Sequence, residues 1–153
     1  MVRATPNNHR LRLGRFSAPG RIYNVTSITD QRRPIFSDWK LGRLVVKEFQ
    51  RAEAQGLACS LAWVVMPDHF HWLFELKQGS LQSLLKQVKA RSAIEINRSI
   101  QSEGRVWQRA FHDRAVRHED DLIKLARYIV ANPVRAGIVR RYGDYPLWDA
   151  AWL

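Results

Sequence analysis

Two histidines separated by one residue, His69 and His71, are the first residues in this sequence whose types and spacing could support chemistry. They begin the apolar segment His69 to Leu76, which is typical of a strand, and side chains two positions apart project from the same face of a strand. Two imidazoles placed in this way can bind one metal ion. Alone, the pair is weak evidence, because strand histidines without a metal are more common.

A tyrosine and an asparagine, Tyr128 and Asn132, form the second pair with chemical potential. They are four residues apart in a segment with helical apolar spacing, which predicts that they share one helix face. Asn132 could lend a carbonyl oxygen to a metal, and Tyr128 could place a phenol beside it. The alternatives are that Tyr128 is a core residue and that Asn132 caps the end of a helix.

These four residues together predict one reaction. A free phenol, with a pKa of about 10, is a poor nucleophile at neutral pH and needs an activated electrophile. A divalent ion held by His69, His71 and Asn132 would polarise a phosphodiester and orient it toward Tyr128. Attack would give a phosphotyrosine intermediate and a free hydroxyl, which conserves the bond energy for rejoining.

The elements that must position these residues follow from apolar periodicity and turn residues. Their order predicts an α+β fold with an antiparallel sheet and helices packed mainly on one face. The expected elements are a strand over 21–29, a helix capped by Ser37 and ended by Gly56, a hairpin of strands over 57–66 and 69–76, a helix capped at Gly79–Ser80 and running to about Ile100, a short strand or pair of strands over 106–116, and a helix that starts near His118 and is stopped by Pro133.

The charge of the chain favours a polyanionic partner. The 153 residues include 25 Lys and Arg against 14 Asp and Glu, a net charge of +11. No segment approaches the roughly 18 apolar residues of a membrane-spanning helix. Cys59 is the single cysteine, so an intrachain disulfide is impossible and a cytoplasmic, nucleoid-associated protein is expected.

The length fits one folded domain. We expect a basic N-terminal arm over 1–19, a catalytic domain over 20–139 and a C-terminal tail over 140–153 that docks on it. The arm and Arg21 are assigned to an unpaired DNA segment and the later cations to a duplex stem, although any one of them could equally belong to a solvated face. The candidate DNA-binding residues are Arg12, Arg15, Arg21, Lys86, Lys89, Arg105, Arg109, Arg114 and Arg117.

Several segments resemble a known family. The segment Pro67-Asp68-His69-Phe70-His71 resembles the His-hydrophobic-His signature of the HUH superfamily. The segment from Tyr128 to Gly137 (YIVANPVRAG) resembles the tyrosine-helix segment of the REP-associated tyrosine transposases, which are single-tyrosine members of that superfamily. Further similar stretches lie at 20–26, 106–114 and 145–149, so the resemblance runs from about Gly20 to the C-terminus.

This resemblance implies a ferredoxin-like fold, a Mg²⁺ or Mn²⁺ ion and a 5′-phosphotyrosine intermediate on single-stranded DNA. It also implies recognition of repetitive extragenic palindromes, which form hairpins. By position, His69 and His71 match the metal histidines, Tyr128 the nucleophile and Asn132 the third ligand. Asn24 stands where relatives commonly have a histidine, and it is assigned no role. Ligand chemistry alone would also allow Zn²⁺ at a two-histidine site.

The predicted function is therefore a metal-dependent endonuclease and strand transferase acting on single-stranded DNA hairpins. The alternative is a protein of the same fold that binds palindromic hairpins without cutting them. An RNA-binding domain would share the charge and sheet, but the sequence lacks the aromatic strand motif of such domains. Whether the protein is a monomer or a homodimer stays open.

Overall fold

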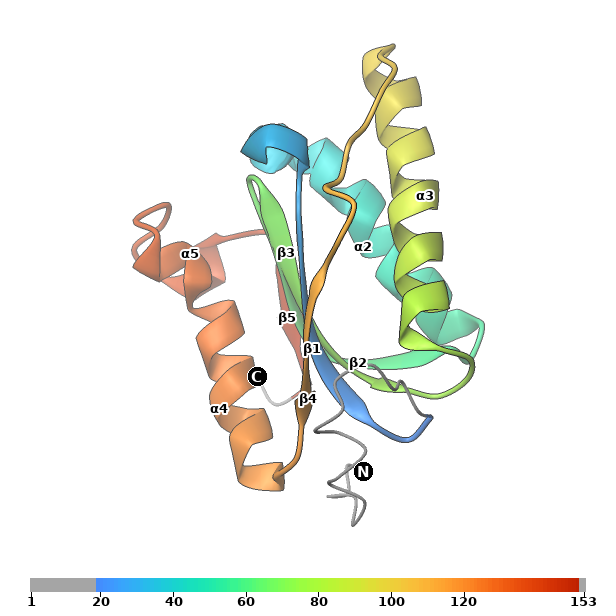
Figure 1. Ribbon diagram of the computed structural model, residues 1–153. Coiled ribbons are helices and arrows are strands. Elements are labelled where there is room, and N and C mark those ends of the chain that lie inside the picture. Colours follow the sequence, from blue (N-terminus) through green and yellow to red (C-terminus); the bar gives the residue numbers. More distant parts are fainter. Residues whose placement is uncertain (1–18, 152–153) are drawn as a thin grey trace.

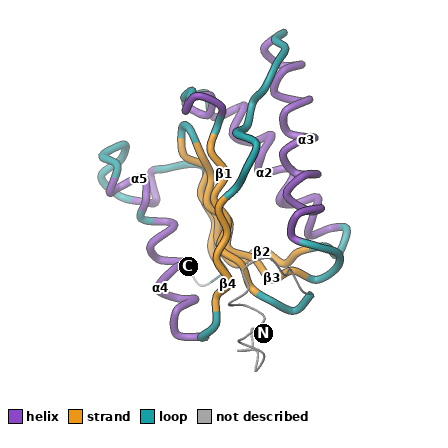
Figure 2. The backbone as a smooth tube through the Cα atoms, in the orientation of Figure 1, coloured by secondary structure: helices purple, strands orange, loops and turns teal. Residues whose placement is uncertain are grey.

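A five-stranded antiparallel sheet forms the centre of the molecule in a computed structural model that describes residues 19–151 (Figures 1 and 2). The strands follow the order β4-β1-β3-β2-β5. Their bounds are Ile22–Ile28 for β1, Ala58–Met66 for β2, His69–Leu76 for β3, His112–Val116 for β4 and Trp148–Ala150 for β5. The order β4-β1-β3-β2 is that of a ferredoxin-like sheet, and it confirms the predicted α+β class.

Helices cover both faces of the sheet (Figure 1). The two long helices, α2 (Trp39–Ala54) and α3 (Leu81–Ile100), lie together on one face, as the sequence predicts. The opposite face carries α4 (Glu119–Val130) and the short α5 (Asn132–Arg135), so coverage is less one-sided than expected. The physical reason is that α4 has an apolar stripe of its own to bury, formed by Leu122, Ala126, Ile129 and Val130.

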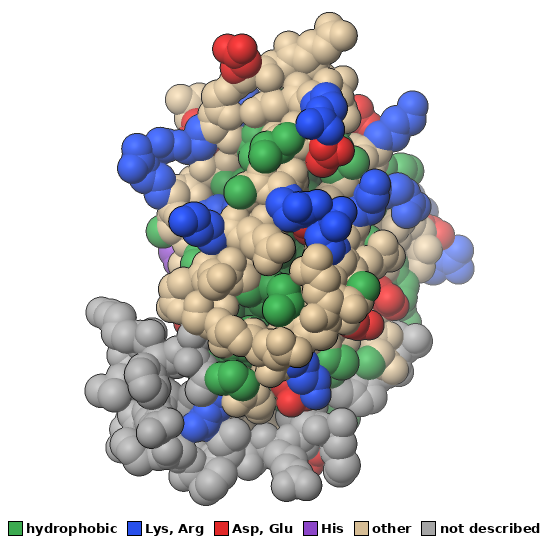
Figure 3. All heavy atoms as spheres, turned by 90° about the vertical axis from the view of Figure 1, so that its right-hand side faces the viewer, with side chains coloured by type: hydrophobic (Ala, Val, Ile, Leu, Met, Phe, Trp, Pro, Cys, Tyr) green, Lys and Arg blue, Asp and Glu red, His purple; other side chains and the backbone are tan. Residues whose placement is uncertain are grey.

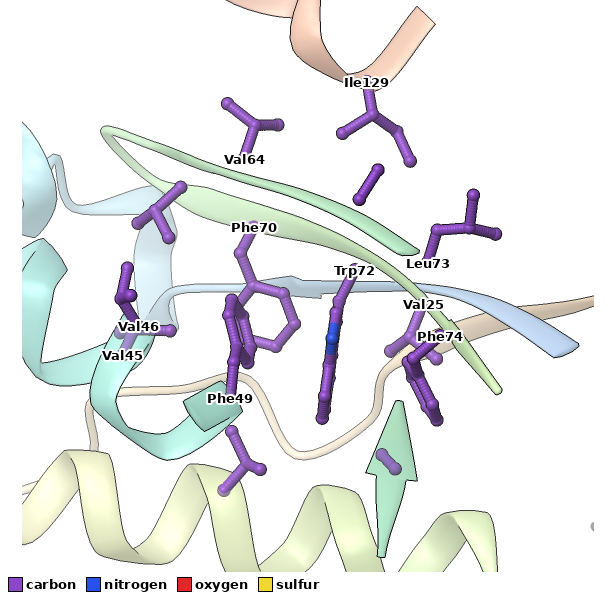
Figure 4. Packing of buried hydrophobic residues seen from close by; sticks show 14 of the residues in the cluster. Val25, Val45, Val46, Phe49, Val64, Phe70, Trp72, Leu73, Phe74 and Ile129 are labelled. Atoms are coloured by element: carbon purple, nitrogen blue, oxygen red, sulfur yellow. The ribbon is translucent and has the colours of Figure 1, made fainter. Parts of the chain in front are cut away.

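Alternation along β3 separates two layers of side chains (Figure 4). Phe70 and Trp72 point toward α2, where the Phe49 ring lies 4.4 Å from the Trp72 ring between centroids. Leu73 points to the other side, toward Ile129 of α4. Side chains alternate along a strand, so His69 and His71 lie on the same side of the sheet as Leu73, the side that faces α4. The aromatic layer under β3 therefore fixes the direction in which the histidines project.

Three boundaries differ from the sequence-based expectation. Asp38 rather than Ser37 caps α2, accepting a hydrogen bond from the Lys40 N–H. The stretch over 106–116 does contain a predicted short strand, β4, but this strand covers only 112–116, and an isolated bridge joins Thr29 to Trp107. The last predicted helix is divided at Ala131, so Tyr128 and Asn132 lie in separate helices.

The C-terminal segment adds β5 to the edge of β2. Tyr145 is buried, and its hydroxyl donates to the Val65 carbonyl at 2.5 Å, while burial raises the pKa of this phenol to about 12. Leu147 is also buried, and it lies so close to Gly42 of α2 that a Cβ at Gly42 would collide with it. Over the described residues, no helix is both long enough and apolar enough to cross a membrane.

Candidate active site

The two histidines of β3 lie edge to face, with ring centroids 4.8 Å apart. His69 donates through Nδ1 to the Asp68 carboxylate at 2.6 Å. Nδ1 of His71 lies 2.8 Å from the hydroxyl of Thr26, the cross-strand neighbour of His71 on β1. Oxygen partners at Nδ1 hold an imidazole in place and leave Nε2 as the nitrogen that can bind a metal.

Asp68 is itself held by a second partner. Arg32 donates to the other Asp68 oxygen at 3.2 Å, from a backbone conformation with φ of 51° that is uncommon for a residue other than glycine. Burial raises the pKa of the Asp68 carboxyl, but the interactions with His69 and Arg32 outweigh burial and leave this pKa lowered. The carboxylate therefore stays charged and available to His69 at neutral pH.

The environment of His71 keeps its ring neutral. Burial, together with the nearby charges of His69 and Arg135, lowers the pKa of His71 to about 4. A neutral imidazole is the form that binds metals, so no proton has to be displaced from this ring at neutral pH.

Tyr128 lies on α4 with 58% of its surface exposed, as a nucleophile requires. The Arg135 guanidinium carbon lies 3.6 Å from the centroid of the Tyr128 ring, a cation–π contact. The same arginine acts electrostatically on His71. The helix that carries Tyr128, α4, packs against β2 and β3 of the same chain.

Arg135 was not among the residues predicted from sequence. It lies seven positions after Tyr128, which is nearly two helical turns, and its guanidinium lies over the tyrosine ring. The signal available in the sequence was Pro133, which is tolerated in the first turn of a new helix as well as beyond the end of an old one. Asn132 begins α5 and is partly buried, and its assignment as a metal ligand stays a prediction.

The donor set fits an open metal site. Within residues 19–151 no group of three His, Cys, Asp or Glu residues is arranged to hold a metal ion. Two anchored imidazoles can instead bind a divalent ion whose other positions are filled by oxygens, the arrangement expected for Mg²⁺ or Mn²⁺ with DNA phosphate. One more oxygen lies on this side of the sheet: Oδ1 of Asn24 on β1 is buried and, in the described part, lacks a hydrogen-bond partner.

The candidate DNA-binding cations are in different environments. Arg12 and Arg15 lie outside the described residues. Arg21 is only 7% exposed, so it offers little surface to DNA. Lys89 donates to the carbonyls of Gln108, Arg109 and Ala110, which uses its three N–H donors to hold this segment on α3. Its burial lowers the pKa of the ammonium.

The other cations lie on two surfaces. Lys86, Arg105 and Arg109 are exposed around a cavity of about 410 Å³ between α3 and the segment after it, on the face where Figure 3 shows many Lys and Arg side chains. Arg114 and Arg117 instead line a groove of about 750 Å³ beside Tyr128, on the opposite side of the sheet from α3.

Comparison with known proteins identifies the family to which this fold and site belong. Residues 19–132 match the family described as IS200-like transposases, which is most of the chain, and the chain therefore belongs to that family of transposases. The individual relatives are transposases by name as well. An Escherichia coli K12 protein named REP-associated tyrosine transposase is 30% identical over 87 residues, which are 56% of this chain and 50% of that protein. The chain thus matches about half the length of this relative.

A Haemophilus influenzae protein, provisionally given the same name, is 24% identical over 148 residues, covering 86% of this chain and 80% of that protein. Among solved structures, a REP-associated tyrosine transposase bound to a REP hairpin superposes with a TM-score of 0.70 at 23% identity, covering 88% of this chain and 79% of that one. A provisionally described transposase from Deinococcus radiodurans gives a TM-score of 0.51 at 18% identity. At these identities the two structures establish the fold.

Proposed function

We propose that this protein is a metal-dependent endonuclease and strand transferase that cuts single-stranded DNA through a 5′-phosphotyrosine intermediate. The observation that carries the proposal is the pair of imidazoles held on β3, His69 by Asp68 at 2.6 Å and His71 by Thr26 at 2.8 Å, beside α4, which packs against β3 and carries the exposed Tyr128. The proposal assigns Tyr128 as the nucleophile, Arg135 as its cationic partner and the two imidazoles as metal ligands.

The chain's own residues account for the main steps. The phenolic oxygen of Tyr128 attacks the phosphorus and forms a new O–P bond, while the bond from phosphorus to the 3′ oxygen breaks. The phenol loses its proton, and the departing 3′ oxygen takes one up. Arg135 is placed to neutralise negative charge next to the phenolic ring. A divalent ion held by His69, His71 and Asn132 would supply Lewis-acid polarisation of the phosphate.

As the substrate we propose hairpins of the REP type, folded from single-stranded palindromes. The net charge of +11 suits a nucleic acid. The names of the relatives, one of which has been solved with a REP hairpin, favour this substrate over other single strands. The exposed cations Lys86, Arg105 and Arg109 are candidates for phosphate contacts along a stem.

A denaturing gel tests the proposal. End-labelled DNA hairpins with unpaired flanks are incubated with the protein and Mg²⁺ or Mn²⁺, beside Tyr128→Phe, which removes only the hydroxyl. We expect a labelled covalent adduct that requires metal and is absent with the variant. Equal cleavage by Tyr128→Phe would exclude Tyr128 as the nucleophile. Tight binding without an adduct under either metal would favour the alternative, a hairpin-binding protein that does not cut.

A further inference from the structure

A groove of about 750 Å³ runs between the edge strand β4 and α4. Figure 1 shows these two elements lying alongside each other, and within residues 19–151 β4 has β1 as its neighbour on one side and no strand on the other. The volume falls within the roughly 300–1,000 Å³ of sites that hold a small-molecule-sized ligand. The groove is therefore large enough for a nucleotide.

The groove and the candidate active site share a residue. Tyr128 forms part of the groove wall, and Arg135 contacts the same ring. A molecule in the groove consequently contacts the proposed nucleophile. For a DNA substrate, this places in the groove a part of the strand that is directly continuous with the attacked phosphate.

The lining matches the chemistry of a single nucleotide. Arg114 and Arg117 contribute cations from the strand side, and Lys124 contributes one from α4. Leu125 and Val116 supply apolar surface against which a base can lie. Asp113 and Asp121 also line the groove, and a carboxylate accepts hydrogen bonds from the amino groups of bases but repels bare phosphate. A nucleotide fits this combination of groups better than an inorganic polyphosphate or an apolar peptide does.

We propose that the groove between β4 and α4 binds an unpaired nucleotide adjacent to the phosphate that Tyr128 attacks. This inference rests on the proposed function and deepens it, because it assigns Arg114 and Arg117 to the unpaired strand rather than to a duplex stem. Cations on both walls hold the sugar–phosphate backbone. The base lies against Leu125, and its identity is read at Asp121.

The test is a scan of abasic sites through the unpaired flanks of a hairpin, with binding measured by fluorescence anisotropy in the Tyr128→Phe background. We expect one or two consecutive abasic positions to weaken binding about 10-fold, the size of a lost base-stacking contact. Leu125→Trp, which fills the groove, should abolish this penalty. Lys40→Glu, an exposed change on α2 at the other face of the sheet, should leave the penalty intact.

A second variant tests the groove without changing the packing of the partly buried Leu125. Lys124→Glu changes an exposed side chain and should weaken binding of the flanked hairpin several-fold, while a hairpin without flanks binds as before. An abasic penalty that is equal in Leu125→Trp and Lys40→Glu, or no penalty at any flank position, would overturn the groove assignment.

The two proposals fail separately in these experiments. Binding in the Tyr128→Phe background needs no cleavage. A groove-dependent penalty without any adduct from the unmodified protein would therefore contradict the nuclease proposal and support the nucleotide site. An adduct from the unmodified protein, with flank binding that does not depend on Lys124 or Leu125, would support the nuclease proposal and contradict the nucleotide site.

Discussion

Replacing Asp68 by alanine should weaken metal binding although Asp68 is not proposed as a ligand. The 2.6 Å hydrogen bond from His69 Nδ1 to this carboxylate sets the orientation and the tautomer of the ring. Losing such a partner costs about 10- to 100-fold in metal affinity, which is about 1.4–2.7 kcal/mol. Arg32→Ala should cost much less, because Arg32 is 62% exposed and an exposed ion pair contributes at most about 1 kcal/mol.

Isothermal titration with Mn²⁺ measures this directly on the unmodified protein, Asp68→Ala and Arg32→Ala. The matched control is Asp144→Ala, which removes a carboxylate that also pairs with an arginine, at 3.6 Å, but is 53% exposed. Thermal melting of each metal-free variant establishes that it is folded. An unchanged Mn²⁺ dissociation constant in folded Asp68→Ala would refute the orienting role. A loss of similar size in Asp144→Ala would show that the effect is one of net charge.

Three further outcomes follow from single side chains. Arg135→Ala should slow formation of the covalent adduct about 10-fold through the lost cation–π contact, with less than threefold change in hairpin binding, as measured by single-turnover kinetics beside Arg127→Ala. The metal-free protein should lose stability as the pH falls from about 6.5 toward 4, because the unfolded chain takes up a proton at His71 before the folded one does; urea melts at pH 7 and pH 5 should show a smaller loss in His71→Asn. Lys89→Met should lower the unfolding free energy by about 1–3 kcal/mol while leaving the salt dependence of DNA binding unchanged, since its ammonium is used by carbonyls.

The position of the histidine pair was predictable because it depends on local information. A strand has a side-chain period of two, so the apolar residues at Phe70 and Trp72 determine which face the histidines take. The structure places β3 over His69–Leu76 with this alternation. The antiparallel hairpin with β2 was equally local, since Pro67 and Asp68 form the turn between the two strands.

The residues that hold the two histidines in place could not be predicted from local sequence patterns. Thr26 is 45 residues from His71 in the chain, and their contact depends on the register between β1 and β3. Arg32 reaches Asp68 from a left-handed backbone conformation that no residue preference indicates. Strand patterning predicts that two strands form, but the pairing register is determined by the packing of the whole sheet.

Arg135 shows how a correct local signal can still mislead. Pro133 predicted a helix end, and α4 does end before it, yet the chain continues into a second helix in which proline occupies the first turn. The prediction that Tyr128 and Asn132 share one helix face made Asn132 the expected neighbour of the tyrosine. The residue that contacts the Tyr128 ring is Arg135, which is nearly two helical turns further along the chain. The Tyr128 ring therefore has a cationic neighbour whose charge also lowers the pKa of His71.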